Sequence, residues 1–345
     1  MGWPETQNPQ KQLTIMKRIF LVLAVGVVAT LITSCFKKTE SGLPPSNGTV
    51  AEVLVVMPNQ QWETSVGAAV KSMLMAEQEG LNQSEPLFEP LQIQHQDYKG
   101  LFERNRKTIR FFVSDTVKKN QLVARRDVFS SPQLIIDLHA KSDSEAIRLL
   151  NERAGSVVEM LREVERERLI LAFSSTQNVA LCEKIEKQFG FSLVIPESYY
   201  MAKSNDGFAW LRLETAKYSQ AILIYSRAFT DSAQFNPSQI IAYRNMIVKQ
   251  NIPGELPGSY MSTDTIAPPV MRNVPFADTR AIEARGLWKT VGDFMGGPFL
   301  SYTFHDKKAN KVITLEGYVY YPSMDKRDLL MQLEAILHSY EVKTK

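Results

Sequence analysis

Few side chains in this sequence have the types and spacing that chemistry requires. The chain holds two cysteines, Cys35 and Cys182, and a cysteine can act as a nucleophile or accept a covalent group. Zinc sites are usually built from closely spaced His, Cys, Asp or Glu ligands. The histidines form no His-Glu-x-x-His or His-x-His pair, so the sequence predicts no metal site. They lie far apart, at His95, His139, His305 and His338.

Recognisable catalytic motifs are also absent from the sequence. No Gly-x-Ser-x-Gly nucleophile elbow occurs. Gly292, Gly296 and Gly297 match neither a P-loop nor the Gly-x-Gly-x-x-Gly pattern of dinucleotide sites. We therefore predict no catalytic residue and no cofactor.

Cys35 is the residue with the clearest chemical setting. Lys17 and Arg18 precede the apolar run Ile19–Leu31, which leads into Ile32-Thr33-Ser34-Cys35. This is the order of a secretory signal, and the cysteine makes it similar to a bacterial lipoprotein signal. In that class the thiol is acylated, as with palmitate, and the chain is cut just before the cysteine. The run is shorter than the ~20 residues of a membrane-spanning helix, so we predict lipid attachment at Cys35.

The residues around the signal bear on where the protein resides. Residues 1–15 are polar and fit no signal, which suggests that Met16 is the true start and the frame is over-extended. Phe36 is not the aspartate of an inner-membrane retention signal, so the outer membrane is favoured. Lys37 and Lys38, rather than an acidic cluster, favour the periplasmic face over the cell surface.

Cys182 lies on an apolar stripe with Val179, Ile185 and Phe189, at the spacing of a helix. This pattern predicts a buried structural cysteine rather than a nucleophile. If Cys35 is acylated, no cysteine remains to form an intramolecular disulfide with Cys182.

Charge composition limits the partners. The chain has 40 Lys and Arg against 37 Asp and Glu, a formal net charge of +3. Nucleic-acid binding needs a basic stripe that displaces counterions, and none is present. The predicted partners are the membrane, through lipidated Cys35, and an envelope protein or glycan-like ligand.

The pattern of apolar residues predicts an α+β fold with largely antiparallel mixed sheets flanked by helices. Ser142 to Glu145 form a capping box before a long amphipathic helix, and several neighbouring strands look like hairpins. We expect a signal at 1–34, a flexible tether at 35–48, and two α/β halves, 49–170 and 171–345, which could be related.

The segment from Gly286-Leu287-Trp288 to Gly292-Asp293-Phe294-Met295-Gly296-Gly297-Pro298-Phe299 is the most distinctive in the body. Together with Cys35, Ser259-Tyr260-Met261 and the helix from Lys326, it resembles a Bacteroidota lipoprotein family known as domain of unknown function 4837. The resemblance covers the chain from the signal to the C-terminus. It implies export, lipidation and a restricted bacterial lineage, and because the family has no assigned activity, it implies no catalytic residue.

A Pro-rich stretch, Ile252 to Pro275, precedes this segment and is predicted to be a long functional loop. Trp and Arg often anchor interfaces, so the candidate binding residues are Tyr260, Arg285, Trp288 and Asp293. The alternative is that Trp288 fills the core and the glycines serve a turn.

Two functions are consistent with these features. The first is a non-catalytic envelope protein that acts in binding or assembly through residues 252–299. The second is an envelope hydrolase with carboxylates assembled in space, for which Asp293 and Glu283 are the first choices.

Overall fold

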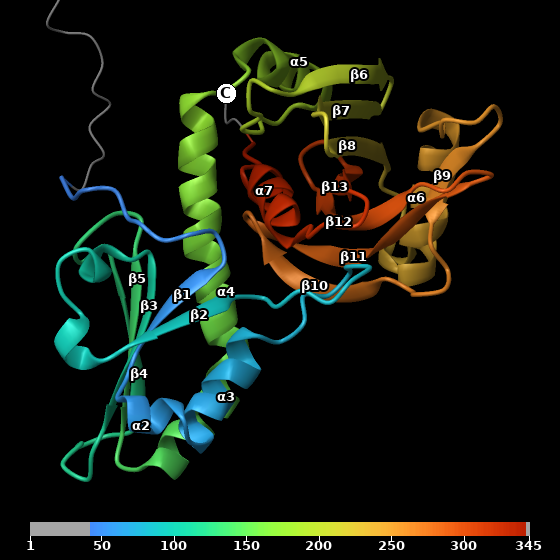
Figure 1. The fold of residues 1–345 in the computed structure, drawn as a ribbon. Helices are drawn as coiled ribbons and strands as arrows, with labels where there is room; N and C mark the ends of the chain where they lie inside the picture. Colours follow the sequence, from blue (N-terminus) through green and yellow to red (C-terminus); the bar gives the residue numbers. More distant parts are fainter. Residues whose placement is uncertain (1–41, 343–345) are drawn as a thin grey trace, which may run out of the picture. The chain divides into compact units, whose positions relative to one another are not determined.

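The computed structural model describes residues 42–342, and the predicted lipid-attachment residue Cys35 lies outside them. Residues from Pro44 onward form one compact unit. They contain two sheets with helices packed on them, which confirms the predicted α+β class (Figure 1). The helices are α2 (Asn59–Trp62), α3 (Ser65–Leu74), α4 (Asp143–Ser175), α5 (Val179–Phe189), α6 (Pro237–Asn251) and α7 (Arg327–His338).

The first sheet has the order β2-β1-β3-β5-β4 and is mostly parallel. Only β4, at one edge, runs antiparallel to its neighbour β5. Helices α3 and α4 bury their apolar stripes on one face of this sheet. Its strands are β1 (Glu52–Val56), β2 (Glu89–Ile93), β3 (Lys107–Val113), β4 (Gln121–Arg126) and β5 (Leu134–Ala140).

The second sheet is antiparallel, with the order β10-β11-β12-β13-β8-β7-β6, and β9 pairs with the far end of β11. Helices α5 and α7 cover one face, and α6 covers the other. Its strands are β6 (Tyr200–Asn205), β7 (Phe208–Glu214), β8 (Ser219–Ala228), β9 (Tyr260–Thr263), β10 (Val270–Phe276), β11 (Thr279–Val291), β12 (Gly296–Asp306) and β13 (Lys311–Tyr320).

Two local predictions were wrong. The apolar run at residues 169–173 predicts a short strand, but these residues belong to the last turns of α4. A short apolar run does not distinguish a strand from a helix. The Pro-rich stretch is not one loop, since it contains β9 and most of β10. Pro275 is tolerated because β10 is an edge strand, where a missing N–H costs little.

The predicted boundary at residue 170 falls inside α4, which therefore belongs to both expected halves. Of the predicted tether, residues 44–47 lie against the body, where Pro45 bridges to Ser131 and Asn47 to Asn105. No helix within residues 42–342 is long and apolar enough to cross a lipid bilayer.

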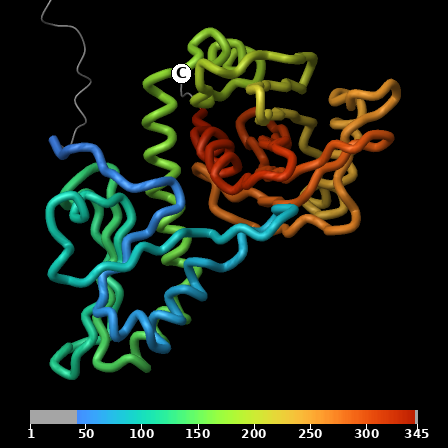
Figure 2. The backbone as a smooth tube through the Cα atoms, viewed as in Figure 1, coloured from blue at the N-terminus to red at the C-terminus, as the bar shows by residue number. Residues whose placement is uncertain are grey.

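The segment between α3 and β2 connects the two sheets. Figure 2 shows it as a cyan tube that reaches the strands of the second sheet, and Glu79 pairs there with Arg272 of β10. The carboxylate of Glu85 accepts the backbone N–H groups of Lys326 and Arg327 at 2.8 Å. Glu85 thus caps the first turn of α7. The position of Asp325 just before the helix predicts it as the cap, but Asp325 does not take this role.

Candidate functional site

An aromatic pocket lies on the face of the second sheet that α6 covers. Its inner wall consists of Trp210 from β7, Trp288 from β11 and Tyr318 from β13, which expose 9%, 3% and 5% of their surface. The indole N–H of Trp210 donates to the Tyr318 hydroxyl at 3.1 Å, and the Trp288 and Tyr318 rings meet edge-on at 5.3 Å. We call this cavity of about 220 Å³ the aromatic pocket.

The position of Trp288 depends on a glycine in the neighbouring strand. Its indole N–H donates to the carbonyl of Val319 at 3.2 Å, across β12. A Cβ atom on Gly297 would lie 2.2 Å from that carbonyl oxygen and 3.2 Å from the indole nitrogen. Gly297 therefore lets Trp288 reach Val319, and this is the packing reason for the glycine.

The mouth of the aromatic pocket carries two charges of opposite sign. The Arg212 guanidinium stacks on the Trp210 ring, 4.8 Å from its centroid, and is paired with Glu214. The exposed Glu255 comes from the loop between α6 and β9, and half-buried Tyr320 completes the edge. The pocket thus offers aromatic faces within and hydrogen-bonding groups at its opening.

Asp293 holds the loop that carries Glu255. Its Oδ2 accepts the backbone N–H of Glu255 at 2.9 Å, and its Oδ1 accepts that of Phe294 at 2.7 Å. These hydrogen bonds, that of Phe294 first, lower the pKa of Asp293. The carboxylate is therefore ionised at neutral pH and ties the α6–β9 loop to the β11–β12 turn.

Burial raises the pKa of the Tyr318 hydroxyl, so it remains a neutral phenol at physiological pH. Its oxygen accepts the Trp210 indole N–H. A neutral phenol and a stacked guanidinium suit hydrogen bonding to a polar ligand rather than acid–base chemistry.

The four sequence-predicted binding residues do not all meet. Trp288 lines the aromatic pocket. Asp293 does not line it, but accepts the backbone N–H of Glu255 at its mouth. Tyr260 lies next to the pocket residue Met261, with its ring under Lys249 at 4.7 Å. Trp288 is also core, as the alternative interpretation required.

Arg285 lies on the opposite face of β11 from Trp288, because side chains three positions apart in a strand point in opposite directions. It is 3% exposed and pairs with Glu334 of α7 at 2.8 Å and with Glu283 at 2.7 Å. Glu334 also pairs with Arg166 of α4. Arg285 therefore joins β11 to two helices and does not line the aromatic pocket.

Sequence reasoning missed Trp210, Arg212, Tyr318 and Tyr320. Trp210 and Arg212 in β7, like Tyr318 and Tyr320 in β13, have the i, i+2 spacing that places two side chains on one face of a strand. The signal was therefore present, but nothing in the sequence says that β7 and β13 flank β8 in the sheet.

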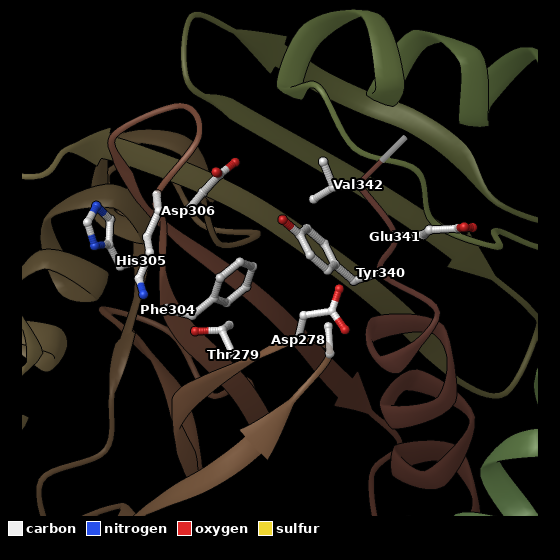
Figure 3. Close-up of a pocket in the computed structure, with 10 residues that line it drawn as sticks. Asp278, Thr279, Phe304, His305, Asp306, Tyr340, Glu341 and Val342 are labelled. Carbon is white, nitrogen blue, oxygen red and sulfur yellow. The ribbon is translucent and has the colours of Figure 1, made fainter. Parts of the chain in front are cut away.

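A second, more polar cavity of about 550 Å³ lies between the ends of β11 and β12 and the C-terminal residues (Figure 3). It is lined by Asp278, Asp306 and Glu341, among others. In Figure 3 Glu341 points away from Asp306, and Asp306 already accepts the backbone N–H groups of Lys308 and Ala309. Nowhere in residues 42–342 do three His, Cys, Asp or Glu side chains gather in a group that could hold a metal.

Cys182 is buried in α5 and has a free thiol, as predicted. The sequence predicts Ser174 and Ser175 as the caps of this helix, but the cap is Asn178, whose side chain accepts the N–H of Leu181. Gly190 ends the helix in the left-handed conformation, with φ of 84°.

Comparison with known families divides the described chain into two stretches. Residues 178–339 match the family described as domain of unknown function 4837. This confirms the family over this stretch, but not the predicted extension of the resemblance from the signal to the C-terminus. Residues 46–174 match a different family, domain of unknown function 8532. Neither description carries an activity, and no curated protein matches the sequence.

Two solved structures are distantly similar. One is a point mutant of the protein Mog1, at 9% identity and a TM-score of 0.30, covering 44% of this chain and 90% of that one. The other is LpqN, described as involved in cell envelope biogenesis of Mycobacterium tuberculosis, at 10% identity and a TM-score of 0.26. That match covers 43% of this chain and 79% of LpqN. Similarity at this level carries no functional argument.

Proposed function

We propose that this chain is a non-catalytic binding protein of the cell envelope, and that its aromatic pocket takes one pyranose ring of a glycan. The observation that supports this is the arrangement of Trp210, Trp288 and Tyr318 around a cavity whose mouth carries Arg212 and Glu255. Aromatic faces pack on the C–H groups of a sugar ring, while charged side chains accept and donate hydrogen bonds to its hydroxyls.

The size of the cavity supports a small ligand group. Pockets for drug-sized ligands have volumes of about 300–1,000 Å³, whereas the aromatic pocket has about 220 Å³. One sugar ring of a longer chain fits this space, and the rest of the glycan would lie along Tyr320 and the α6–β9 loop.

The envelope location rests on the sequence around Cys35, which is outside the described residues. A short apolar run after two basic residues, ending at a cysteine, supports export and acylation. Replacement of Cys35 by alanine should abolish labelling with a palmitate analogue and release the protein from membranes after a carbonate wash. A labelled, membrane-bound Cys35→Ala protein would exclude this anchor.

The experiment for the pocket is isothermal titration calorimetry with cellotetraose, maltotetraose and chitotetraose. We expect saturable binding of at least one tetrasaccharide, with a Kd that Tyr320→Ala raises by at least about tenfold, or 1.4 kcal/mol. Tyr321→Ala is the matched control, because this neighbouring tyrosine packs against Tyr218 on the other face of the sheet. Equal loss in both variants, or no binding to any of the three, would refute the proposal.

The alternative function, a hydrolase with paired carboxylates, has less support. Glu283 accepts hydrogen bonds from Arg285 and from the Tyr302 hydroxyl in the core that α7 covers. Asp293 lies at the β11–β12 turn beside Glu255. Glu283 and Asp293 thus lie in different surroundings, and each carboxylate already accepts hydrogen bonds from neighbouring groups. This favours a binding role over hydrolysis by a carboxylate pair.

A further inference from the structure

A groove runs between the edge strand β4 and the long helix α4, on the first sheet and apart from the aromatic pocket. It has a volume of about 480 Å³. Its floor is apolar and includes Leu122 of β4, Ile136 of β5, and Leu149 and Val157 of α4. We call it the β4–α4 groove.

Polar bridges close the two ends of this groove. At one end Asn120 donates to the carboxylate of Glu145 on α4, and at the other Arg126 of β4 pairs with Glu167 of α4. Between them β4 spans six residues, or about 20 Å of extended chain. The open part therefore has the length of a short peptide strand.

The outer edge of β4 has no strand beside it in the described chain. Alternate backbone N–H and C=O groups of an edge strand point outward and can pair with an added strand. Ala124, in the middle of β4, is exposed and small, so a second backbone can approach there. Peptides that add a strand to a sheet edge place alternate side chains in the adjoining groove.

The charges at the rim indicate the nature of the occupant. Arg148 of α4 is already paired with Glu145 and Glu152. Arg153 and Lys119, which line the groove, are exposed and have no ion-pair partner among residues 42–342. A carboxylate on the bound segment would complement these two cations.

We propose that the β4–α4 groove binds an extended segment of a partner protein that pairs with the edge of β4. Its alternate apolar side chains occupy the floor formed by Leu122, Leu149 and Val157, and a carboxylate contacts Arg153 and Lys119. This site is independent of the aromatic pocket.

A peptide library tests the proposal with the full-length protein. The probe is a synthetic pool of N-acetylated hexapeptides with Val, Ile or Leu at alternate positions, Ser or Thr between them, and a free C-terminal carboxylate. We expect wild-type protein to enrich a subset of this pool, while Ser156→Trp, which fills the groove, enriches none. No enrichment over Ser156→Trp would overturn the proposal.

The peptide that binds most tightly is then used to measure separately the contribution of Arg153 and that of backbone pairing with β4. Arg153→Glu should raise its Kd by at least about tenfold, and N-methylation of alternate peptide bonds should abolish binding because strand pairing needs the N–H groups. Gly155→Ala is the matched control on α4, since a Cβ there meets no atom within 4 Å. Binding that survives N-methylation, or that is insensitive to Arg153→Glu, would contradict strand addition at this groove. Tyr320→Ala in the aromatic pocket should leave peptide binding unchanged.

Discussion

Trp288 has contacts that make it part of the core and contacts that make it part of the aromatic pocket. Its indole N–H is bonded to Val319, and its ring lies 5.3 Å from Tyr318 and 6.2 Å from Tyr320. Removing such a buried side chain costs about 3–5 kcal/mol, so an alanine variant would lose stability together with binding. For this reason Tyr320, at the mouth, is the better residue for testing the ligand.

Gly297→Ala should destabilise the protein because the added methyl group has no space. Its Cβ would lie 2.2 Å from the Val319 carbonyl oxygen, and overpacking of this kind costs about 1–3 kcal/mol. Urea unfolding followed by circular dichroism measures the loss. Gly155→Ala is the control, because a Cβ at that position meets no atom within 4 Å. If both variants lose the same amount, the close approach to Val319 is unimportant.

His338 should make stability depend on pH in the mildly acidic range. Burial, and then the charge of Arg166, lower the pKa of its imidazole to about 4. Because this is below the unfolded value of about 6.5, folding favours the neutral ring. The stability that depends on a neutral His338 is fully present above the unfolded pKa, and it is lost as the pH falls towards the folded pKa.

We expect the free energy of unfolding to fall by about 2 kcal/mol between pH 7 and pH 5 through His338 alone. His338→Phe keeps an aromatic ring beside Phe276 and Tyr302 but cannot titrate. Urea unfolding of both proteins at the two pH values gives the difference. Equal pH dependence in wild type and His338→Phe would show that this histidine is not responsible.

At the level of elements, the β11–β12 turn holds the α6–β9 loop in place through Asp293. Asp293→Ala removes the acceptor for the Glu255 N–H and frees the loop that forms the mouth of the aromatic pocket. Because Asp293 lies at the surface, the melting temperature should hardly change, while the tetrasaccharide Kd should rise by about tenfold. Calorimetry and thermal unfolding of the same sample measure both. A large drop in melting temperature with unchanged affinity would contradict this role.

The strong periodic patterns predicted elements well. The capping box at Ser142 marks the start of α4, and its side chain accepts the N–H of Glu145. Of the stripe around Cys182, Cys182 itself and Ile185 are buried in α5, whereas Val179 in the first turn is exposed. Local patterns could not determine pairing, however, and the parallel order of β1, β3 and β5 depends on crossovers that no single segment encodes.

The predicted segment 252–299 contributes part of the aromatic pocket, but the sequence did not indicate the other residues of its wall. Residues 252–299 do supply Trp288, Glu255 and Met295 to the aromatic pocket. The remaining wall comes from β7 and β13, which are distant in sequence and meet only through the sheet. Arg285 and Trp288 lie on opposite faces of β11, and this could not be foreseen without knowing that residues 279–291 form one strand.

At the scale of the whole molecule, charged residues join the two sheets. Glu85, from the segment before β2, caps α7, and Arg166 of α4 pairs with Glu334 of α7. These contacts link residues more than 160 positions apart. They explain why residues from Pro44 onward form one compact unit.

Glu85→Gln should weaken this connection. The amide keeps one acceptor oxygen but loses the charge that stabilises the helix N-terminus, so we expect a loss of about 1 kcal/mol. Chemical unfolding measures it, with Glu77→Gln as the control because Glu77 is an exposed residue of the same segment. A loss in the control as large as that in Glu85→Gln would rule out a capping role.

Tryptophan indole NMR shows whether a glycan ring enters the aromatic pocket. The indole N–H signals of Trp210 and Trp288 report on the pocket, whereas Trp62 in α2, under Lys71, reports on the first sheet. Titration with the tetrasaccharide that binds by calorimetry should shift the Trp210 and Trp288 signals saturably and leave that of Trp62 in place. If neither pocket signal moves, or if the Trp62 signal moves with them, the glycan does not bind in the aromatic pocket.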